Sequence, residues 1–183
     1  MRPSISSATL ALIALGFAAL AHPQSPPTPE KRCQDPVFHQ FDFWLGDWDV
    51  STPEGELAGH NSISREEYGC LLVEHWTSAN GVTGQSYNFV DRVTGRWRQI
   101  WVSAGATIDY QGGLDDRGRM RLEGTIGYPP DNPANGARFR GTWTANDDGS
   151  VRQHFEQFDA AKGEWTDWFV GIYRKRDPSS APR

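Results

Sequence analysis

The sequence contains few of the residues on which most metal and redox sites depend. Among its 183 residues are two cysteines and five histidines. The cysteines form no C-x-x-C pair, so neither a thioredoxin-like redox site nor a zinc knuckle is indicated. The histidines form no H-x-H or H-x-x-x-H pair. A haem site would need one histidine as an axial ligand in an apolar pocket, and His154 is the best placed. We expect no cofactor, with haem as the alternative.

Familiar catalytic motifs are also missing. The run Gly84-Gln85-Ser86-Tyr87-Asn88 lacks the second glycine of G-x-S-x-G. No glycine-rich loop precedes a helical pattern, so a phosphate cradle is not indicated. Carboxylates are plentiful, but no spacing among them marks a glycosidase pair. These motifs therefore do not identify a reaction.

Positive charge is scarce. The chain has 18 Lys and Arg against 23 Asp and Glu, a net charge of −5 at pH 7. Such a chain has no electrostatic reason to bind nucleic acid or anionic lipid. We expect a small-molecule partner, no nucleic acid and no stable membrane insertion. The oligomeric state stays open.

An apolar run at the N-terminus predicts export. Arg2 precedes the apolar stretch 8–20, and Ala19-Leu20-Ala21 matches an A-x-A cleavage site. We predict a signal peptide over 1–21 and a periplasmic or secreted mature protein that begins at His22. A retained N-terminal anchor is the alternative. No cysteine follows the cleavage site, which argues against a lipid anchor.

The two cysteines are predicted to pair. Residues 22–36 form a Pro-rich spacer that cannot make a regular backbone hydrogen-bond pattern, and Cys33 lies within it. The other cysteine is Cys70. In an exported chain two cysteines more often form a disulfide than two free thiols. A Cys33–Cys70 bond would tie the spacer to the folded domain.

From Asp47 onward the sequence alternates between short strands and turn formers. The stretch Phe41–Leu45 has the spacing of a helical turn, and Gly46 permits a corner into the first strand. The turn formers predict a single all-β domain over 37–176 and a disordered tail over 177–183. About ten regular strands favour an antiparallel up-and-down β-barrel, wide enough for an internal cavity. The expected strands are 47–52, 56–67, 70–78, 83–91, 96–103, 106–112, 119–127, 137–145, 150–158 and 164–174.

A set of short motifs resembles a family of bacterial exported proteins. The motifs are Phe41–Val50, Gly69-Cys70, Glu74-x-Trp76, Gly84-x-Ser86-x-Asn88 and Trp97-x-Gln99-x-Trp101. The family is a domain of unknown function that opens with D-F-W-x-G-x-W-D-V. The resemblance implies a lipocalin-like (calycin-like) barrel and no particular reaction. It also implies that Trp48 stacks on Arg174 late in the last strand, or on Lys175 if the register differs by one residue.

The hairpin 83–103 carries candidate ligand-binding residues. A four-residue loop between Asp91 and Arg96 would place Asn88 opposite Gln99 and would place Ser86 opposite Trp101. Val90 would lie opposite Trp97 on the same face, so this face would hold amide and hydroxyl groups between two indoles, which suits an amphipathic ligand. In the alternative, this face lies outside and the core is formed by Tyr87, Phe89 and Ile100.

Glu74 is the remaining candidate. It shares a strand face with Leu72 and Trp76, where burial would raise its pKa and suit it to hydrogen bonding or acid–base chemistry. In the alternative, Glu74 lies on the surface. We predict an exported lipocalin-like barrel that binds a small apolar or amphipathic molecule. The alternative function is a barrel enzyme (an isomerase, lyase or hydrolase) with Glu74 as general acid or base. The predicted cavity residues are Glu74, Trp76, Ser86, Asn88, Gln99 and Trp101.

Overall fold

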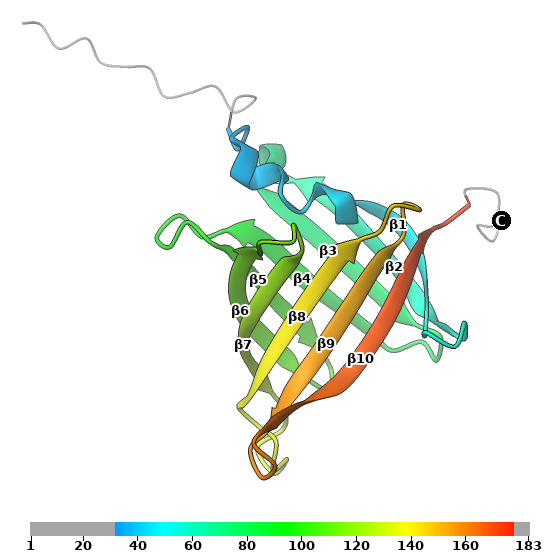
Figure 1. Ribbon diagram of the computed structural model, residues 1–183, viewed down its shortest axis with the longest axis vertical. Coiled ribbons are helices and arrows are strands. Elements are labelled where there is room, and N and C mark those ends of the chain that lie inside the picture. The colour runs from blue at the N-terminus through cyan, green and yellow to red at the C-terminus, as the bar shows by residue number, and fades with distance from the viewer. Residues whose placement is uncertain (1–31, 178–183) are drawn as a thin grey trace, which may run out of the picture.

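Ten antiparallel strands close into one up-and-down barrel (Figure 1). The computed structural model describes residues 32–177. Each strand pairs with the next in sequence, and β1 pairs with β10 to close the barrel. The predicted fold class is confirmed. The strands are β1 Gly46–Ser51, β2 Leu57–Glu66, β3 Leu71–Ser78, β4 Thr83–Val90, β5 Trp97–Ser103, β6 Thr107–Leu114, β7 Met120–Gly127, β8 Ala137–Ala145, β9 Val151–Asp159 and β10 Glu164–Lys175.

The loop between β4 and β5 shows how turn residues set the register. The Asp91 side chain accepts hydrogen bonds from the backbone N–H groups of Val93 and Thr94. Gly95 then adopts φ 68°, a left-handed conformation that glycine takes without steric strain. The resulting hairpin pairs Asn88 with Gln99. The predicted hairpin register is therefore confirmed.

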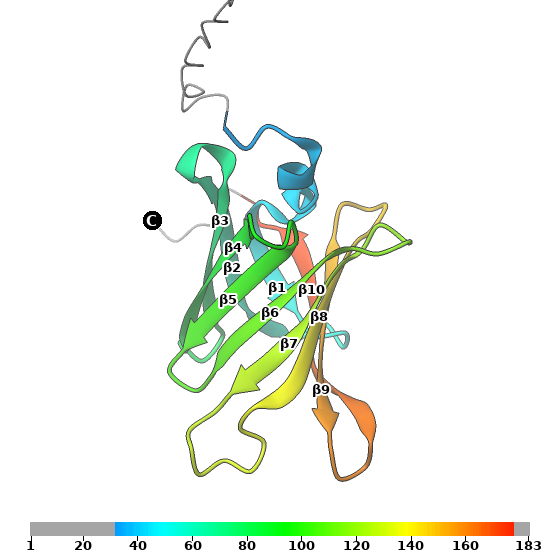
Figure 2. The ribbon, with the colours of Figure 1, turned by 90° about the vertical axis from the view of Figure 1, so that its left-hand side faces the viewer.

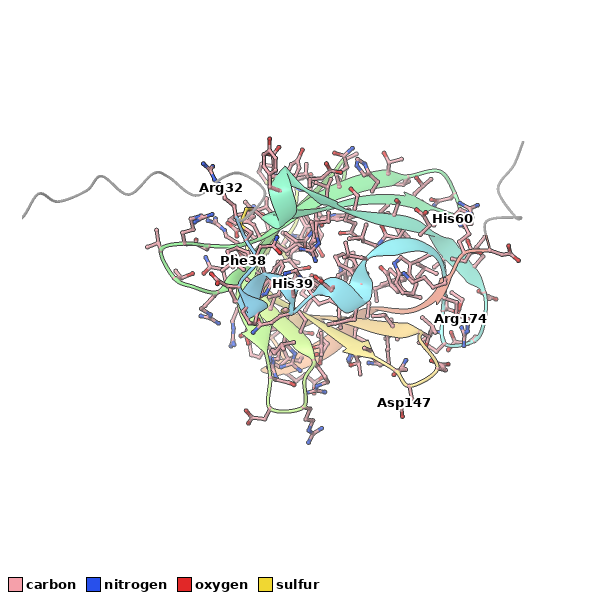
Figure 3. All side chains as sticks on the ribbon, turned by 90° about the horizontal axis from the view of Figure 1, so that it is seen from above. Arg32, Phe38, His39, His60, Asp147 and Arg174 are labelled. Atoms are coloured by element: carbon pink, nitrogen blue, oxygen red, sulfur yellow. A yellow bond between two sulfur atoms is a disulfide. The ribbon has the colours of Figure 1, made fainter. Side chains whose placement is uncertain are left out.

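A short N-terminal segment covers one end of the barrel, seen from above in Figure 3. It contains the 3₁₀ helices η2 (Pro36–His39) and η3 (Asp42–Trp44), so a helical turn precedes β1 as predicted. Phe41 and Trp44 are completely buried and stack with ring centroids 4.9 Å apart. Phe41 also meets Trp143 edge to face at 5.2 Å. We call residues 33–45 the cap segment, and the end of the barrel that it covers the capped end.

A disulfide fastens the cap to the barrel wall. Cys33, just before η2, bonds to Cys70, which lies between η4 (Glu67–Gly69) and β3. The predicted pairing is confirmed. The predicted signal peptide (1–21) and most of the predicted spacer (22–36) lie outside the described residues, as does nearly all of the predicted tail (177–183). Between residues 32 and 177, no helix has the length and apolar character needed to cross a bilayer.

Lys175, and not Arg174, packs on Trp48. Its Nζ lies 3.8 Å from the centroid of the indole ring and donates to the carbonyl of Leu45. Lys175 stands opposite Trp48 across the β1–β10 ladder, whereas Arg174 stands opposite Asp49 and is exposed. Directly opposed residues share a sheet face. The prediction of Arg174 was therefore wrong by one residue, and the alternative with Lys175 is correct.

Lys175→Ala should lower the free energy of unfolding by about 1 kcal/mol, because it removes the cation–π contact and a hydrogen bond to Leu45. Arg174→Ala is the matched control and should change the free energy of unfolding by less than about 0.5 kcal/mol. Urea unfolding followed by circular dichroism measures both. Equal midpoints for the two variants would show that Lys175 acts only as a surface charge.

Candidate functional site

A cavity of about 190 Å³ occupies the half of the barrel away from the cap. Figures 1 and 2 show that the β9–β10 hairpin and the β7–β8 loop extend from the end of the barrel opposite the capped end. Several aromatic residues of the wall keep partial exposure, so the cavity is reached from solvent. The lining residues are Glu74, Trp76, Gln99, Trp101, Ile108, Gln153, Phe155, Trp168, Phe169 and Tyr173.

Four of the six predicted cavity residues line this space: Glu74, Trp76, Gln99 and Trp101. The other two, Ser86 and Asn88, are fully buried beside Glu74 and Gln99 but do not line the cavity. The alternative orientation is wrong, because Tyr87 is 50% exposed on the outer face. The alternative of a surface Glu74 is also wrong, because that side chain is only 4% exposed.

The buried polar residues form one connected hydrogen-bond network across the barrel interior. Its two branches meet at Glu74, where Ser86 Oγ and Asn61 Nδ2 each donate to one carboxyl oxygen. A shared network of this kind positions each member more rigidly than a single bond would. The network residues are Asn61, Glu74, Ser86, Asn88, Gln99, Tyr110, Gln153 and Tyr173.

The first branch runs through β4, β5 and β6. Asn88 Nδ2 donates to Ser86 Oγ at 2.9 Å and to the backbone carbonyl of Leu72 at 3.2 Å. Gln99 Nε2 donates to Asn88 Oδ1, and Tyr110 Oη donates to Gln99 Oε1. Ser86 and Asn88 therefore fix the positions of the cavity residues Glu74 and Gln99 by hydrogen bonds, although they do not line the cavity themselves.

The second branch crosses β2, β10 and β9. Asn61 Nδ2 donates to Glu74 Oε1 at 2.7 Å and to Tyr173 Oη at 3.2 Å. Tyr173 Oη in turn donates to Gln153 Oε1 at 2.9 Å. Sequence reasoning missed Asn61, Gln153 and Tyr173. Their strands were predicted, so inward alternation could have marked them, but a polar residue in a strand is usually assigned to the solvent face.

Burial raises the pKa of Glu74 from 4.5 to about 7, and the hydrogen bonds from Ser86 and Asn61 offset part of that rise. A carboxylate loses hydration when it is buried, and this disfavours the charged form. Burial and the nearby Glu74 carboxylate likewise raise the pKa values of Tyr110 and Tyr173 well above 10. Both tyrosines therefore stay neutral donors, and Glu74 is poised to change charge near neutral pH.

A bulge in β10 turns an extra tryptophan toward the cavity. The register with β9 shifts between Asp167 and Phe169, which leaves Trp168 unpaired. Such a bulge can place two successive side chains on one face. Trp168 is 46% exposed at the mouth, and its Nε1 donates to Tyr128 Oη at 2.9 Å. Strict alternation cannot anticipate this residue.

Gly84 makes room for Trp101. A Cβ at Gly84 would lie 2.2 Å from Cζ2 of the Trp101 indole. The indole therefore lies against bare backbone across the β4–β5 ladder. A side chain at this position would push Trp101 away from its place in the cavity wall.

His154, the candidate axial ligand, does not line the cavity. Its Nε2 lies 2.6 Å from Oδ1 of Asp167, and its Nδ1 lies 4.0 Å from Glu156. These three side chains could approach one metal ion. Glu156, however, already accepts two hydrogen bonds of 2.6 Å from Arg140, which lower its pKa. The interior cavity, and not this cluster, is the better candidate site.

Fold and site together define a closed up-and-down β-barrel with a cavity built around a buried carboxyl group. No protein-family model matches the chain, and no curated protein has a similar sequence. The resemblance to the exported family therefore stays a prediction.

Proposed function

We propose that this protein is exported and binds a small amphipathic molecule inside its barrel. The observation that carries the proposal is the cavity of about 190 Å³, whose walls are mainly aromatic and whose polar groups belong to one network. An apolar cavity of roughly 150 Å³ is enough for a benzene ring. The ligand would therefore have a ring or short chain as its body and one polar head.

Two features support export. The Cys33–Cys70 disulfide is typical of oxidising compartments such as the periplasm or the extracellular space. The N-terminal sequence has the charged, apolar and A-x-A regions of a signal peptide. Intact-mass measurement of the exported pool tests this part of the proposal, because a mature protein should begin at His22.

Trp101→Ala should weaken binding of an aromatic alcohol such as 2-phenylethanol by about 10-fold. An aromatic contact contributes about 0.5–1.5 kcal/mol beyond the apolar area that it buries, and the upper end of this range corresponds to a factor of about ten. Tryptophan fluorescence during titration with fatty acids, aromatic alcohols and haem identifies the binding class, and calorimetry then measures Kd.

Trp165→Ala is the matched control, because Trp165 packs outside the barrel under the guanidinium groups of Arg138 and Arg140. It should leave Kd unchanged. Equal Kd values for the wild type and Trp101→Ala would contradict the assigned site. Failure of all three ligand classes, and of small organic amines as well, to bind would contradict the proposed function.

A second candidate function is catalysis by Glu74. The specific observation in its favour is a carboxyl group at the cavity with a pKa of about 7, suited to general acid–base work near neutral pH. Mass spectrometry of bound molecules after incubation separates the two functions. Recovery of unchanged ligand supports a binder, whereas conversion by the wild type but not by Glu74→Gln supports an enzyme.

A further inference from the structure

We infer that the cavity ligand is a small organic amine, with its ammonium group on Glu74 and its apolar body between the aromatic walls. This inference rests on the proposed function and specifies the ligand class. Three features of the cavity support it: the charge of its lining, the excess of acceptor oxygens at Glu74 and the aromatic walls.

No positive charge balances Glu74 in the cavity. The residues that line it, within the described part of the chain, include no Lys, Arg or His. The charge of Glu74 acts on Tyr110 and Tyr173, and the raised pKa values of both tyrosines keep them neutral. A buried carboxylate without a cationic partner is unfavourable, so a cation brought by the ligand would be stabilised there.

The hydrogen-bond network has more acceptors than donors near Glu74. Each carboxyl oxygen accepts one hydrogen bond, from Asn61 or Ser86, although a carboxylate oxygen can accept two. The Oδ1 atom of Asn61, a neighbour of Glu74 outside the cavity lining, is also buried and accepts no hydrogen bond from residues 32–177. An ammonium group has three donors and no acceptor. It therefore matches this end of the cavity.

The same features disfavour an anionic ligand. A fatty-acid carboxylate beside Glu74 would bring two negative charges together in a site that offers no cation among its lining residues. A neutral alcohol can donate only one hydrogen bond to the carboxylate, and it brings no charge. We therefore expect the order of affinity to be amine, then alcohol, then carboxylate for ligands with the same body.

The aromatic walls suit a cation with a small apolar body. Trp76 and Phe169 meet edge to face at 6.4 Å, and Phe155 lies 5.5 Å from Trp143 and 6.1 Å from Trp168. The faces of such rings attract a cation once it leaves water, and their area also binds an apolar body. The volume of about 190 Å³ favours a single ring with a short chain.

Binding of an ammonium group should release a proton at mildly acidic pH, because the cation requires the ionised form of Glu74. With a pKa of about 7, Glu74 in the free protein is about 90% ionised at pH 8 and about 3% ionised at pH 5.5. An alkylamine with a pKa near that of lysine, about 10.4, stays protonated at both values. Amine affinity should therefore fall about 30-fold between pH 8 and pH 5.5.

Calorimetric titration of the full-length mature protein tests the inference with three probes that share a phenylethyl body. They are 2-phenylethylamine, 2-phenylethanol and 3-phenylpropionate. At pH 8 the amine should bind at least about 10-fold more tightly than the alcohol, because a hydrogen bond between two charged groups is stronger than one from a neutral hydroxyl. Only the amine should lose about 30-fold in affinity at pH 5.5.

Glu74→Gln should abolish both the preference for the amine and its pH dependence, and it should weaken the amine at least about 10-fold more than the alcohol. The control is Glu164→Gln, which removes an exposed carboxylate at the start of β10 without touching the cavity. It should leave all three Kd values unchanged. This control measures the general attraction of an amine to an acidic protein.

The outcomes separate the two proposals. Equal binding of amine and alcohol, or an amine affinity that survives in Glu74→Gln, would overturn the amine inference and leave cavity binding intact. Equal weakening of both ligands in Glu74→Gln would also overturn it, since Glu74 would then only shape the cavity. Failure of every probe to bind at millimolar concentration would overturn the proposed function as well.

Discussion

Glu74→Gln should stabilise the protein by about 3 kcal/mol at pH 8. In the unfolded chain Glu74 has the ordinary pKa of 4.5, whereas burial raises the pKa to about 7 in the folded protein. One pKa unit corresponds to about 1.4 kcal/mol, so ionising Glu74 in the folded barrel opposes folding by about 3 kcal/mol. Glutamine resembles the protonated acid in shape and does not ionise.

The pH window follows from the same shift. Between pH 4.5 and about 7 the folded protein holds one more proton at Glu74 than the unfolded chain. This contribution to stability is complete below pH 4.5 and is lost as pH rises through 7. The difference in unfolding free energy between Glu74→Gln and wild type should therefore grow from near zero at pH 4.5 to about 3 kcal/mol at pH 8.

Urea unfolding at half-unit pH steps measures this difference. Other groups, such as Asp115 and Glu156, have lowered pKa values and also make stability depend on pH. Their contributions are the same in both proteins, so they cancel in the difference between Glu74→Gln and wild type. Glu164→Gln, which removes an exposed carboxylate outside the cavity, is the matched control. A constant difference between Glu74→Gln and wild type from pH 4.5 to pH 8 would mean that Glu74 does not titrate in this range.

Removal of the disulfide should have an effect of similar size. The Cys33→Ser, Cys70→Ser double variant should lose roughly 3–4 kcal/mol of unfolding free energy, as a closed loop of this length predicts in the chain-entropy model. The bond spans a sequence separation of 37 residues and holds the cap segment at the barrel end. Without this bond, the segment that carries the buried rings of Phe41 and Trp44 is no longer covalently held at the barrel end.

The measurement has two parts. Thiol counting on unreduced, denatured wild-type protein should find no free thiol, and urea unfolding should then compare the oxidised wild type with the double variant. Wild type treated with a reductant should unfold at the same midpoint as the double variant. An unchanged midpoint after reduction would mean that the cap is held by its aromatic contacts alone.

Much of the barrel could be predicted because its signals are local. Turn formers such as Thr94-Gly95 mark strand ends within a few residues, and a short hairpin loop fixes which residues face each other. The pairs Asn88–Gln99 and Ser86–Trp101 were accordingly correct. Whether such a face points inward depends on the whole barrel, and for this reason the sequence left two orientations open for hairpin 83–103.

The errors and omissions arise from long-range pairing. β1 meets β10 across nearly the whole domain, so no loop fixes their register, and the partner of Trp48 was placed one residue too early. Asn61 of β2 donates to both Glu74 and Tyr173, and only barrel closure brings Tyr173 of β10 within reach of Asn61. The bulge at Trp168 breaks the two-residue period that such predictions use.

The aromatic cap has a consequence for the order of folding. Phe41 and Trp44 contact Trp97 of β5, Trp143 of β8 and Tyr173 of β10, so their site exists only after distant strands have come together. The cap segment is synthesised before the strands, and it can be buried only after the last strand, β10, has joined the barrel. Contacts between such distant parts of a chain are slow to form. Until β10 is in place, the rings of Phe41 and Trp44 stay exposed, and exposed apolar surface of this kind favours aggregation of the incompletely folded chain.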